Sequence, residues 1–372
     1  MKKYLISVIL LIALILFGVY ISQNKNTETV RIAAIYPLTG GLSSYGEPAQ
    51  KVAQLAVADV NASGGINGKK LEVVFEDHRC DPKTAVSAFE KLNSSQNIHI
   101  FTSVACTGTA LAMIPSLQTK DSILLGTVTS GNKLTSVSPY FFRNWASDLQ
   151  ESKLLADQII KKGYKNIAVI YEETDYAKGL VISLEDFLKG TNVKISKESF
   201  TSDSKDIISQ LIKLQALHPD LMFVSVQTVS TGELVMTQME QLRFKPSAMF
   251  VNDNILKASA LVASHSNLLE GAIGGDYAFI QSGALVQLLK KYKDTYGTDC
   301  PQINICAAEY DAVQFLAKAL SASDGSTQSV QKYLKQNSYN GVSGTIGFDE
   351  NNDRKNAQYS LFVIKSGKAE LF

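Results

Sequence analysis

The chain has few of the side chains that bind metals. Only four cysteines and four histidines occur in 372 residues. No CxxC or HExxH motif is present, and the histidines stand singly along the chain without the spacing of metal ligands. We therefore expect no metal site, and nothing else in the sequence calls for a cofactor.

An excess of charge of one sign is also absent. The chain carries 36 Lys and Arg against 35 Asp and Glu, and residues 1–26 hold three of the lysines and no acidic residue. The remainder is therefore slightly acidic, without a basic stripe or a helix-turn-helix or zinc-finger spacing. These absences argue against a nucleic-acid partner.

The common catalytic and nucleotide-binding motifs are missing. The segment Gly64 to Lys69 is similar to a phosphate loop, but Ser63 stands at the first glycine position and Lys70 replaces the required Ser or Thr. We interpret it as a tight turn from helix to strand. No GxGxxG follows the first expected strand and no GxSxG occurs, which argues against dehydrogenases and common hydrolases.

A calcium loop is excluded in the same way. Asp349, Asn351 and Asp353 match its first three ligand positions, but position six is Arg354 instead of glycine and position twelve is Ser360 instead of glutamate. We interpret this segment as a solvated turn.

The amino terminus carries a long uncharged run. Lys2 and Lys3 precede the apolar stretch from Leu5 to Ile21, and the next charge is Lys25. The run is long for a signal-peptide core and close to the lower limit for a membrane-spanning helix. We expect residues 1–26 to be a signal peptide or an amino-terminal anchor through residues 4–24, with a slight preference for the anchor because no small-residue cleavage site follows. Either way, the lysines place everything after the segment outside the cytoplasm.

An even number of cysteines outside the cytoplasm indicates disulfide pairs. The natural partners are near neighbours, and joining Cys80 to Cys106 closes a loop of about 27 residues. Pairing of Cys300 with Cys306 is compatible with Pro301 between them, and the sequence leaves it open.

From Val30 onward, short apolar runs alternate with helical stretches, the pattern of a parallel sheet covered by helices. We expect a helix at Pro48 to Asn61, another at Ala307 to Leu320, and a final strand pair turning at Ser366-Gly367. Two such series occur, before and after the segment Arg143 to Asp148. The expected strands are Arg31 to Pro37, Lys70 to Glu76, His99 to Val104, Ile123 to Val128, Asn166 to Tyr171, Leu221 to Val226 and Ala248 to Asn252.

Two segments combine small hydroxyl residues with the end of an expected strand. They are Cys106-Thr107-Gly108-Thr109 and Val128-Thr129-Ser130-Gly131. Backbone N–H groups at a helix start, together with hydroxyls, bind a carboxylate well. Ser and Thr also serve as ordinary helix caps, and both interpretations stay open at this point.

Several further segments carry a resemblance to a known family. They are Ile35 to Gly40, Asp59 to Gly68, Cys80 to Val86, Tyr310 to Val313 and Gly341 to Gly344 with Phe348-Asp349. Through their order along the chain, over about residues 29 to 372, the sequence resembles the periplasmic type I solute-binding proteins of ABC importers, in particular the branch of leucine/isoleucine/valine-binding proteins. The resemblance implies an α/β fold of two doubly wound parallel-sheet lobes joined by a three-segment hinge. We place lobe 1 at residues 27–147 plus 276–341 and lobe 2 at residues 148–275 plus 342–372.

The resemblance also implies how the first lobe would hold an amino acid. Thr107 would bind the ligand carboxylate, and the Val128 carbonyl and the Ser130 hydroxyl would meet its carboxylate and ammonium groups, with Thr129 as the substitute for Ser130. Tyr45 matches an aromatic position of the pocket, where simple packing is the alternative.

In the second lobe, the resemblance assigns Tyr176 to the ligand-facing tyrosine, again with packing as the alternative. It assigns Asp253 to the acceptor of the ammonium group, unless Asp253 faces water in a turn. Gln227-Thr228 departs from the tyrosines of the close relative, so we expect Gln227 to make the pocket more polar.

These expectations combine into one function. We expect a non-catalytic, monomeric receptor that captures a small amino acid, branched-chain or related, and delivers it to an ABC permease in the membrane. The alternative is a membrane-tethered sensory ectodomain for a small amide or amino acid-like solute. An extracellular hydrolase is a third class, for which the motifs offer no nucleophile and base.

Overall fold

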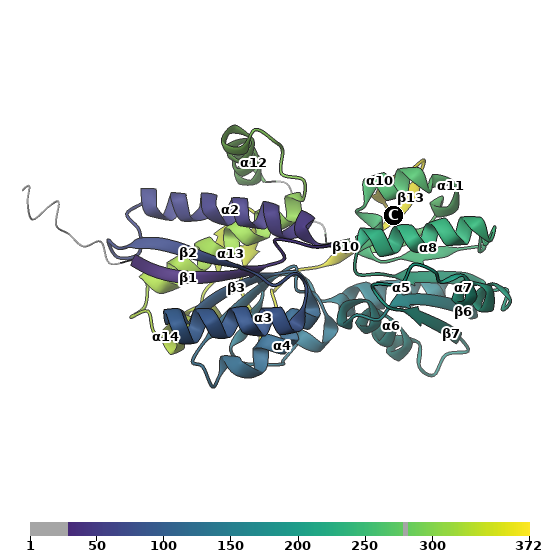
Figure 1. Ribbon diagram of the computed structural model, residues 1–372, viewed down its shortest axis with the longest axis horizontal. Coiled ribbons are helices and arrows are strands. Elements are labelled where there is room, and N and C mark those ends of the chain that lie inside the picture. Colours follow the sequence, from purple (N-terminus) through teal and green to yellow (C-terminus); the bar gives the residue numbers. More distant parts are fainter. Residues whose placement is uncertain (1–28, 278–281) are drawn as a thin grey trace, which may run out of the picture.

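The computed structural model describes residues 29–277 and 282–372, and the predicted signal peptide or anchor lies outside this part of the chain. Two lobes lie side by side along the long axis of the molecule (Figure 1). None of the helices within the described ranges is long and apolar enough to cross a membrane.

The first lobe is built on a parallel sheet with the strand order β2-β1-β3-β4-β5. Side chains of β1 alternate between two cores: Ile32 and Ala34 pack against α2, α13 and α14, whereas Ala33 and Ile35 pack against α3 and α4. Helices therefore cover both faces of the sheet, as the alternation of apolar runs and helical stretches in the sequence predicts. The strands are β1 (Thr29–Tyr36), β2 (Lys70–Asp77), β3 (Ile100–Val104), β4 (Ile123–Thr127) and β5 (Phe141–Arg143). The helices are α2 (Ser43–Ala62), α3 (Pro82–Glu90), η1 (Lys91–Ser95), α4 (Thr107–Leu117), η2 (Asn132–Leu134), α12 (Gly283–Tyr296), α13 (Ile303–Ser321) and α14 (Thr327–Gln336), and the hairpin is β11 (Tyr339–Gly341) with β12 (Gly344–Ile346).

The second lobe is built on a sheet with the order β14-β13-β10-β9-β8-β6-β7, in which only β13 and β14 run antiparallel to their neighbours. Helices α5 and α6 cover one face, and α7, α8 and the short helices α9 to α11 cover the other. The strands are β6 (Asn166–Glu172), β7 (Lys194–Phe200), β8 (Leu221–Ser225), β9 (Met249–Val251), β10 (Ile273–Tyr277), β13 (Tyr359–Lys365) and β14 (Lys368–Leu371). The helices are α5 (Asp148–Lys162), α6 (Asp175–Leu188), α7 (Ile208–Gln215), α8 (Val229–Gln241), α9 (Asp253–Leu256), α10 (Ser259–Ser264) and α11 (Ser266–Leu269).

The chain passes between the lobes after β5, between β10 and α13, and before β13. At the second of these places, β10 stays in the second sheet to Tyr277, and at the third, Ile346 and Phe348 still pack in the core of the first lobe. At both places the chain therefore leaves its lobe a few residues after the expected boundaries at 275 and 341.

Each of the seven expected strands is present, with ends that differ by at most two residues. Three strands of the two large sheets were missed in the prediction. β5 has only three residues, β7 is an edge strand that contains three charged residues, and β10 contains Gly274-Gly275.

The expected start of the helix at Pro48 is wrong. Helix α2 begins at Ser43, a turn earlier, and contains Pro48. The early turn forms because Leu42 and Tyr45 are buried, and the Tyr45 N–H donates to the Leu42 carbonyl at 2.9 Å. Burial of these side chains outweighs the hydrogen bond that the proline cannot donate.

The turn between β13 and β14 agrees with its prediction. Lys365 pairs with Lys368, and the two residues between them, Ser366 and Gly367, have φ angles of 49° and 74°. Positive φ at both positions is the type I′ turn, which matches the twist of the paired strands.

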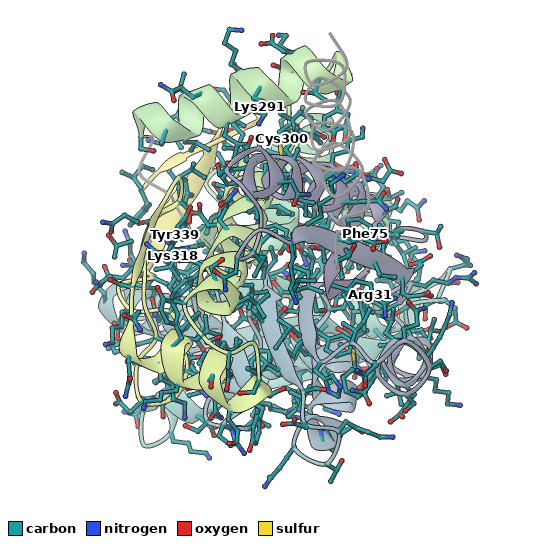
Figure 2. The ribbon with its side chains drawn as sticks, turned by 90° about the vertical axis from the view of Figure 1, so that its left-hand side faces the viewer. Arg31, Phe75, Lys291, Cys300, Lys318 and Tyr339 are labelled. Atoms are coloured by element: carbon teal, nitrogen blue, oxygen red, sulfur yellow. A yellow bond between two sulfur atoms is a disulfide. The ribbon has the colours of Figure 1, made fainter. Side chains whose placement is uncertain are left out.

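Helix α12 lies against α2 at the side of the first lobe, and Figure 2 shows Lys291 and Cys300 there. Lys291 binds Asp59 of α2, whose other oxygen accepts a hydrogen bond of 2.7 Å from the Tyr310 hydroxyl of α13. Cys300, in the segment that joins α12 to α13, forms a disulfide with Cys306 of α13.

Candidate ligand-binding site

The carboxyl ends of the strands of both sheets face each other across a narrow cleft. A cavity of about 20 Å³ lies there, large enough for about one water molecule. Seven of the eight predicted ligand-binding residues line it, and Thr129 does not. The lining residues are Leu42, Tyr45, Ala105, Cys106, Thr107, Val128, Ser130, Tyr176, Gln227, Asp253 and Asn254.

Thr129 is turned into the first lobe. Its side chain is fully buried, and its hydroxyl donates to the Thr127 carbonyl at 3.2 Å. Between the two, Val128 has a φ of 58°, a conformation that β-branched residues rarely adopt. This backbone conformation directs Ser130, and not Thr129, to the cavity.

A second strained turn stands beside the first. Ala105 and Cys106, which follow β3, have φ angles of 60° and 57°. Non-glycine residues in this region cost of the order of 1–3 kcal/mol each and gather at functional sites, where the surrounding structure holds them in place. Both turns line the cavity, so the strained backbone coincides with the predicted site.

Thr107 is the first residue of α4 and is not its cap. The cap position is Cys106, which makes no side-chain capping bond, and the Thr107 hydroxyl has no hydrogen-bond partner among the described residues. A Cβ atom at Gly131 would lie 2.2 Å from Cγ2 of Thr107, so only glycine fits at position 131. The Thr107 side chain is therefore packed in place with its hydroxyl available at the cavity.

The predicted disulfide between Cys80 and Cys106 is present, with a Cα–Cα distance of 5.5 Å. It ties the turn that lines the cavity to the loop after β2. Because Cys106 also lines the cavity, the disulfide forms part of its wall.

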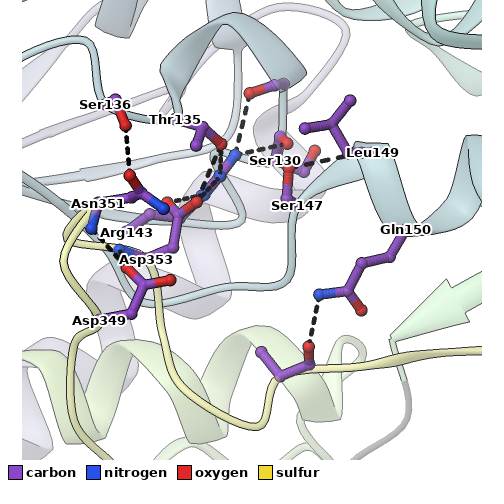
Figure 3. Close-up of polar contacts among 12 residues, drawn as sticks. Ser130, Thr135, Ser136, Arg143, Ser147, Leu149, Gln150, Asp349, Asn351 and Asp353 are labelled. Atoms are coloured by element: carbon purple, nitrogen blue, oxygen red, sulfur yellow. Dashed lines mark hydrogen bonds and ion pairs between the residues drawn. The ribbon is translucent and has the colours of Figure 1, made fainter.

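Arg143, which is fully buried, holds the turn around Ser130 (Figure 3). Its guanidinium group donates to the carbonyls of Ser130 and Gly131, both at 2.9 Å, and its Nε donates to Oδ1 of Asp353 at 2.8 Å. Asp353 belongs to the segment that is similar to a calcium loop, and its carboxylate binds this arginine at the crossing between the lobes. Our interpretation of the segment as a solvated turn is therefore wrong for Asp353.

On the second lobe, Asp253 begins the short helix α9 and its carboxylate is buried. One oxygen accepts a hydrogen bond from the Tyr176 hydroxyl, and the other lies 2.7 Å from Nζ of Lys257. Asn252 orients the tyrosine by donating to its hydroxyl at 2.9 Å. Asp253 thus faces the cavity and not open water, which argues against the turn interpretation.

Contacts between the lobes close the cleft. The Tyr45 hydroxyl donates to Oδ1 of Asn254 at 2.8 Å, and Asn132 donates to the Gly179 carbonyl at 3.3 Å. Lys133 lies 3.5 Å from Asp175 on the outer side. The structure is therefore a closed form, and a ligand larger than water needs these contacts to open.

The buried groups of the cleft have shifted pKa values. Burial raises the pKa of Tyr45 to about 12 and that of Tyr176 well above its ordinary range, so both hydroxyls remain donors at neutral pH. Burial, together with the nearby Asp253, raises the pKa of Asp148 to about 7 and that of Glu151 well above its ordinary range. Both Glu151 oxygens lack a partner in the described structure, which fits a carboxyl group that stays protonated.

Four lining residues were not predicted, namely Leu42, Ala105, Cys106 and Asn254. Asn254 adjoins the predicted Asp253, and its amide donates to the Val226 and Gln227 carbonyls at 3.1 and 3.0 Å. An Asn-Asp-Asn run directly after a buried strand is the signal that could have identified it. Leu42 and Ala105 carry no such signal, because apolar residues beside a strand end usually belong to the core.

The described residues contain no group of three His, Cys, Asp or Glu side chains that could hold a metal ion. The chemistry of the site consists instead of hydroxyl and backbone donors on the first lobe opposite a carboxylate on the second. Such a pair of walls suits a small dipolar molecule.

Comparison with known proteins identifies the family of the chain. The chain is 24% identical over 349 residues to the leucine-, isoleucine-, valine-, threonine- and alanine-binding protein of Pseudomonas aeruginosa, covering 92% of each chain. A leucine-binding protein from Thermotoga maritima has the same fold, with a TM-score of 0.80 at 22% identity over 92% of this chain and 97% of that one. A solute-binding protein of an ABC transporter from R. palustris, solved in complex with benzoate, has a TM-score of 0.78 at 15% identity over 93% and 96%. The family model described as periplasmic binding protein matches residues 29–369, and the chain therefore belongs to the periplasmic binding protein family.

Proposed function

We propose that this protein is an extracytoplasmic substrate-binding protein of an ABC importer and captures a small amino acid, branched-chain or related, by closure of its two lobes. The observation that carries the proposal is the cavity itself. Thr107 and Ser130 of the first lobe and Asp253 of the second lobe line it together.

The carboxylate of the ligand belongs to the first lobe. The start of α4 offers backbone N–H groups and the positive end of the helix dipole, and the Thr107 hydroxyl adds a directed donor. The strained turns at Cys106 and Val128 hold these donors in position before the ligand arrives.

The ammonium group of the ligand belongs to the second lobe, at Asp253. The carboxylate already accepts from Tyr176 and Lys257, and its two oxygens offer about four lone-pair sites, so another donor can bind. A ligand that bridges Thr107 and Asp253 links the two lobes. It therefore binds the closed form more tightly than the open form and shifts the population toward closure.

The side chain of the ligand meets mostly apolar groups. Leu42, Ala105, Val128 and the Cys106 disulfide line the cavity with Tyr45, and Gln227 and Asn254 are the polar exceptions. This lining supports a small aliphatic side chain, as in the amino acids named for the Pseudomonas aeruginosa relative. An ABC permease in the membrane is the expected recipient, since the family supplies such importers.

Thermal melting of the full chain, purified in mild detergent, tests the proposal. The ligands are L-leucine, L-isoleucine, L-valine, L-threonine and L-alanine, each beside the acid of the same carbon skeleton that lacks the amino group. At least one amino acid should raise the melting temperature in a concentration-dependent way, and its des-amino acid should raise it less. If none of the five amino acids shifts the melting temperature, the amino-acid function is wrong.

A further inference from the structure

Lys257 lies behind the ligand cavity, between two carboxylates. Its Nζ is 2.7 Å from Oδ2 of Asp253 and 3.2 Å from Oδ1 of Asp276. The side chains of all three are at least four-fifths buried, and Asp276 is further fixed because its Oδ1 accepts from the Tyr277 N–H at 2.7 Å. Lys257 does not line the cavity, whereas Asp253 does.

The charges of this cluster do not cancel. Two carboxylates share one lysine in a place that is largely closed to water, which leaves one net negative charge while both carboxylates are ionised. Burial raises the pKa of Asp276, and the neighbouring Lys257 acts against this shift. The neighbouring Glu151 adds no charge while its carboxyl group is protonated, and burial also raises the pKa of the nearby Asp148, to about 7. Within the described residues, Lys257 is the one basic side chain that forms an ion pair with either aspartate. A buried negative charge without a counter-ion is costly, so the cluster favours one additional cation.

In this geometry, Lys257 and the ammonium group of a ligand compete for the carboxylate of Asp253. In the closed form, the cation at Asp253 is Lys257, and a ligand ammonium needs the same carboxylate. Two cations beside one carboxylate repel each other, and this repulsion is offset when one of them also pairs with a second carboxylate. Asp276 is that second carboxylate, because Lys257 can keep a full ion pair with it without leaving its position.

We propose that Lys257 is an exchangeable counter-ion of the ligand site: it neutralises Asp253 when no ligand is bound, and it passes to Asp276 when the ammonium group of an amino acid takes over Asp253. The inference rests on the proposed function and deepens it. It makes Asp276, which does not line the cavity, a specificity-determining residue for ligands with an ammonium group. It also explains how a buried aspartate is kept paired in both states.

Binding measurements on four forms of the full chain test the exchange: the wild type, Asp276→Asn, Lys257→Met, and the double variant Lys257→Met/Asp276→Asn. The double variant keeps the net charge of the cluster while removing the competitor and its second partner together. The probes are the amino acid from the five above that the wild type binds most tightly and its des-amino acid. The exposed Lys197, which pairs with Glu185 in the same lobe, provides the control variant Lys197→Met.

In Asp276→Asn, Lys257 has only Asp253, so amino acid affinity should fall tenfold or more while the affinity for the des-amino acid changes less than threefold. Removal of Lys257 from this variant should restore amino acid affinity to within threefold of the wild type, a non-additive rescue typical of coupled residues. Lys257→Met alone should increase the preference for the amino acid over the des-amino acid, and Lys197→Met should change neither affinity.

Equal weakening of both probes in Asp276→Asn, or a double variant no better than Asp276→Asn, would overturn the exchange. If Asp276→Asn does not fold, the test rests on Lys257→Met. In that case, the inference is overturned if Lys257→Met has the same preference between the two probes as the wild type. Failure of the proposed function has a different signature. In that case, the wild type itself binds none of the five amino acids, and the inference falls with it.

Discussion

The hydroxyl of Tyr45 on the first lobe donates a hydrogen bond of 2.8 Å to Oδ1 of Asn254 on the second lobe. Both side chains line the ligand cavity, and Asn254 also holds the Val226 and Gln227 carbonyls. The bond therefore joins the two walls of the site directly. It exists only while the lobes are closed, so its strength enters the balance between the open and closed forms.

Tyr45→Phe should shift this balance toward the open form. The change removes one buried hydrogen bond, worth about 1 kcal/mol, which is about a fivefold change in the ratio of the two forms. Small-angle X-ray scattering without ligand should show a larger radius of gyration than for the wild type. Tyr292→Phe, in the contact between α12 and α2, is the control, and equal radii for wild type and Tyr45→Phe would contradict the role of the bond.

Asp353→Asn should strongly destabilise the protein. Arg143 is fully buried, and the variant leaves its charge without the carboxylate that compensates it. Breaking a buried pair in this way costs about 3–5 kcal/mol. Urea unfolding should show this loss, whereas Asp157→Asn, which breaks an exposed pair with Lys153, should cost less than about 1 kcal/mol. Similar costs for the two variants would contradict the stabilising role of the buried pair.

Glu309 should make stability depend on pH. Burial raises the pKa of this carboxyl group from 4.5 to about 7, although the Tyr36 and Thr102 hydroxyls act against the shift. The folded state therefore holds the proton more tightly than the unfolded state. The resulting stability is fully present below about pH 4.5 and is lost as the pH rises through about 7.

Glu309→Gln stays neutral at every pH and should avoid this loss. Relative to the wild type, the variant should gain stability of about 2.5 kcal/mol between pH 5 and pH 8. Urea unfolding of both proteins at the two pH values measures the gain. Other titrating groups cancel in the comparison, so an equal difference between the proteins at pH 5 and pH 8 would contradict the prediction.

The two disulfides should contribute unequally to stability. Cys80 and Cys106 are 26 residues apart, and Cys300 and Cys306 only six. On the chain-entropy model, replacing the first pair with serine costs about 3.5 kcal/mol and replacing the second about 2.4 kcal/mol. Urea unfolding of the two double variants gives the comparison. Only the first replacement should also weaken ligand binding, because Cys106 lines the cavity.

Much of the architecture could be predicted from the sequence because parallel strands buried on both faces are continuous apolar runs. β8 and β4 are fully buried throughout and were predicted to within one residue. β7 was missed because it is an edge strand in which three of the seven residues are charged, namely Lys194, Lys197 and Glu198.

The candidate site could be predicted only as far as residue type and position after a strand determine it. Ser130 and Thr129 are chemically alike, and the choice between them depends on the left-handed backbone at Val128, which no local pattern indicates. Lys257 was missed because a lysine four residues after an aspartate on a short helix normally indicates a solvated ion pair. Its burial against Asp276 depends on β10, which is distant in sequence.

The most direct test of the account is calorimetric titration of the full chain and of Asp253→Asn with the amino acid that stabilises the wild type most and with its des-amino acid. We predict one site per chain in the wild type. Asp253→Asn should lose at least tenfold more affinity for the amino acid than for the des-amino acid, because only the amino acid brings an ammonium group to that carboxylate. Equal losses for the two ligands, or wild-type affinity in Asp253→Asn, would contradict the central claim that Asp253 receives the ammonium group of an amino acid.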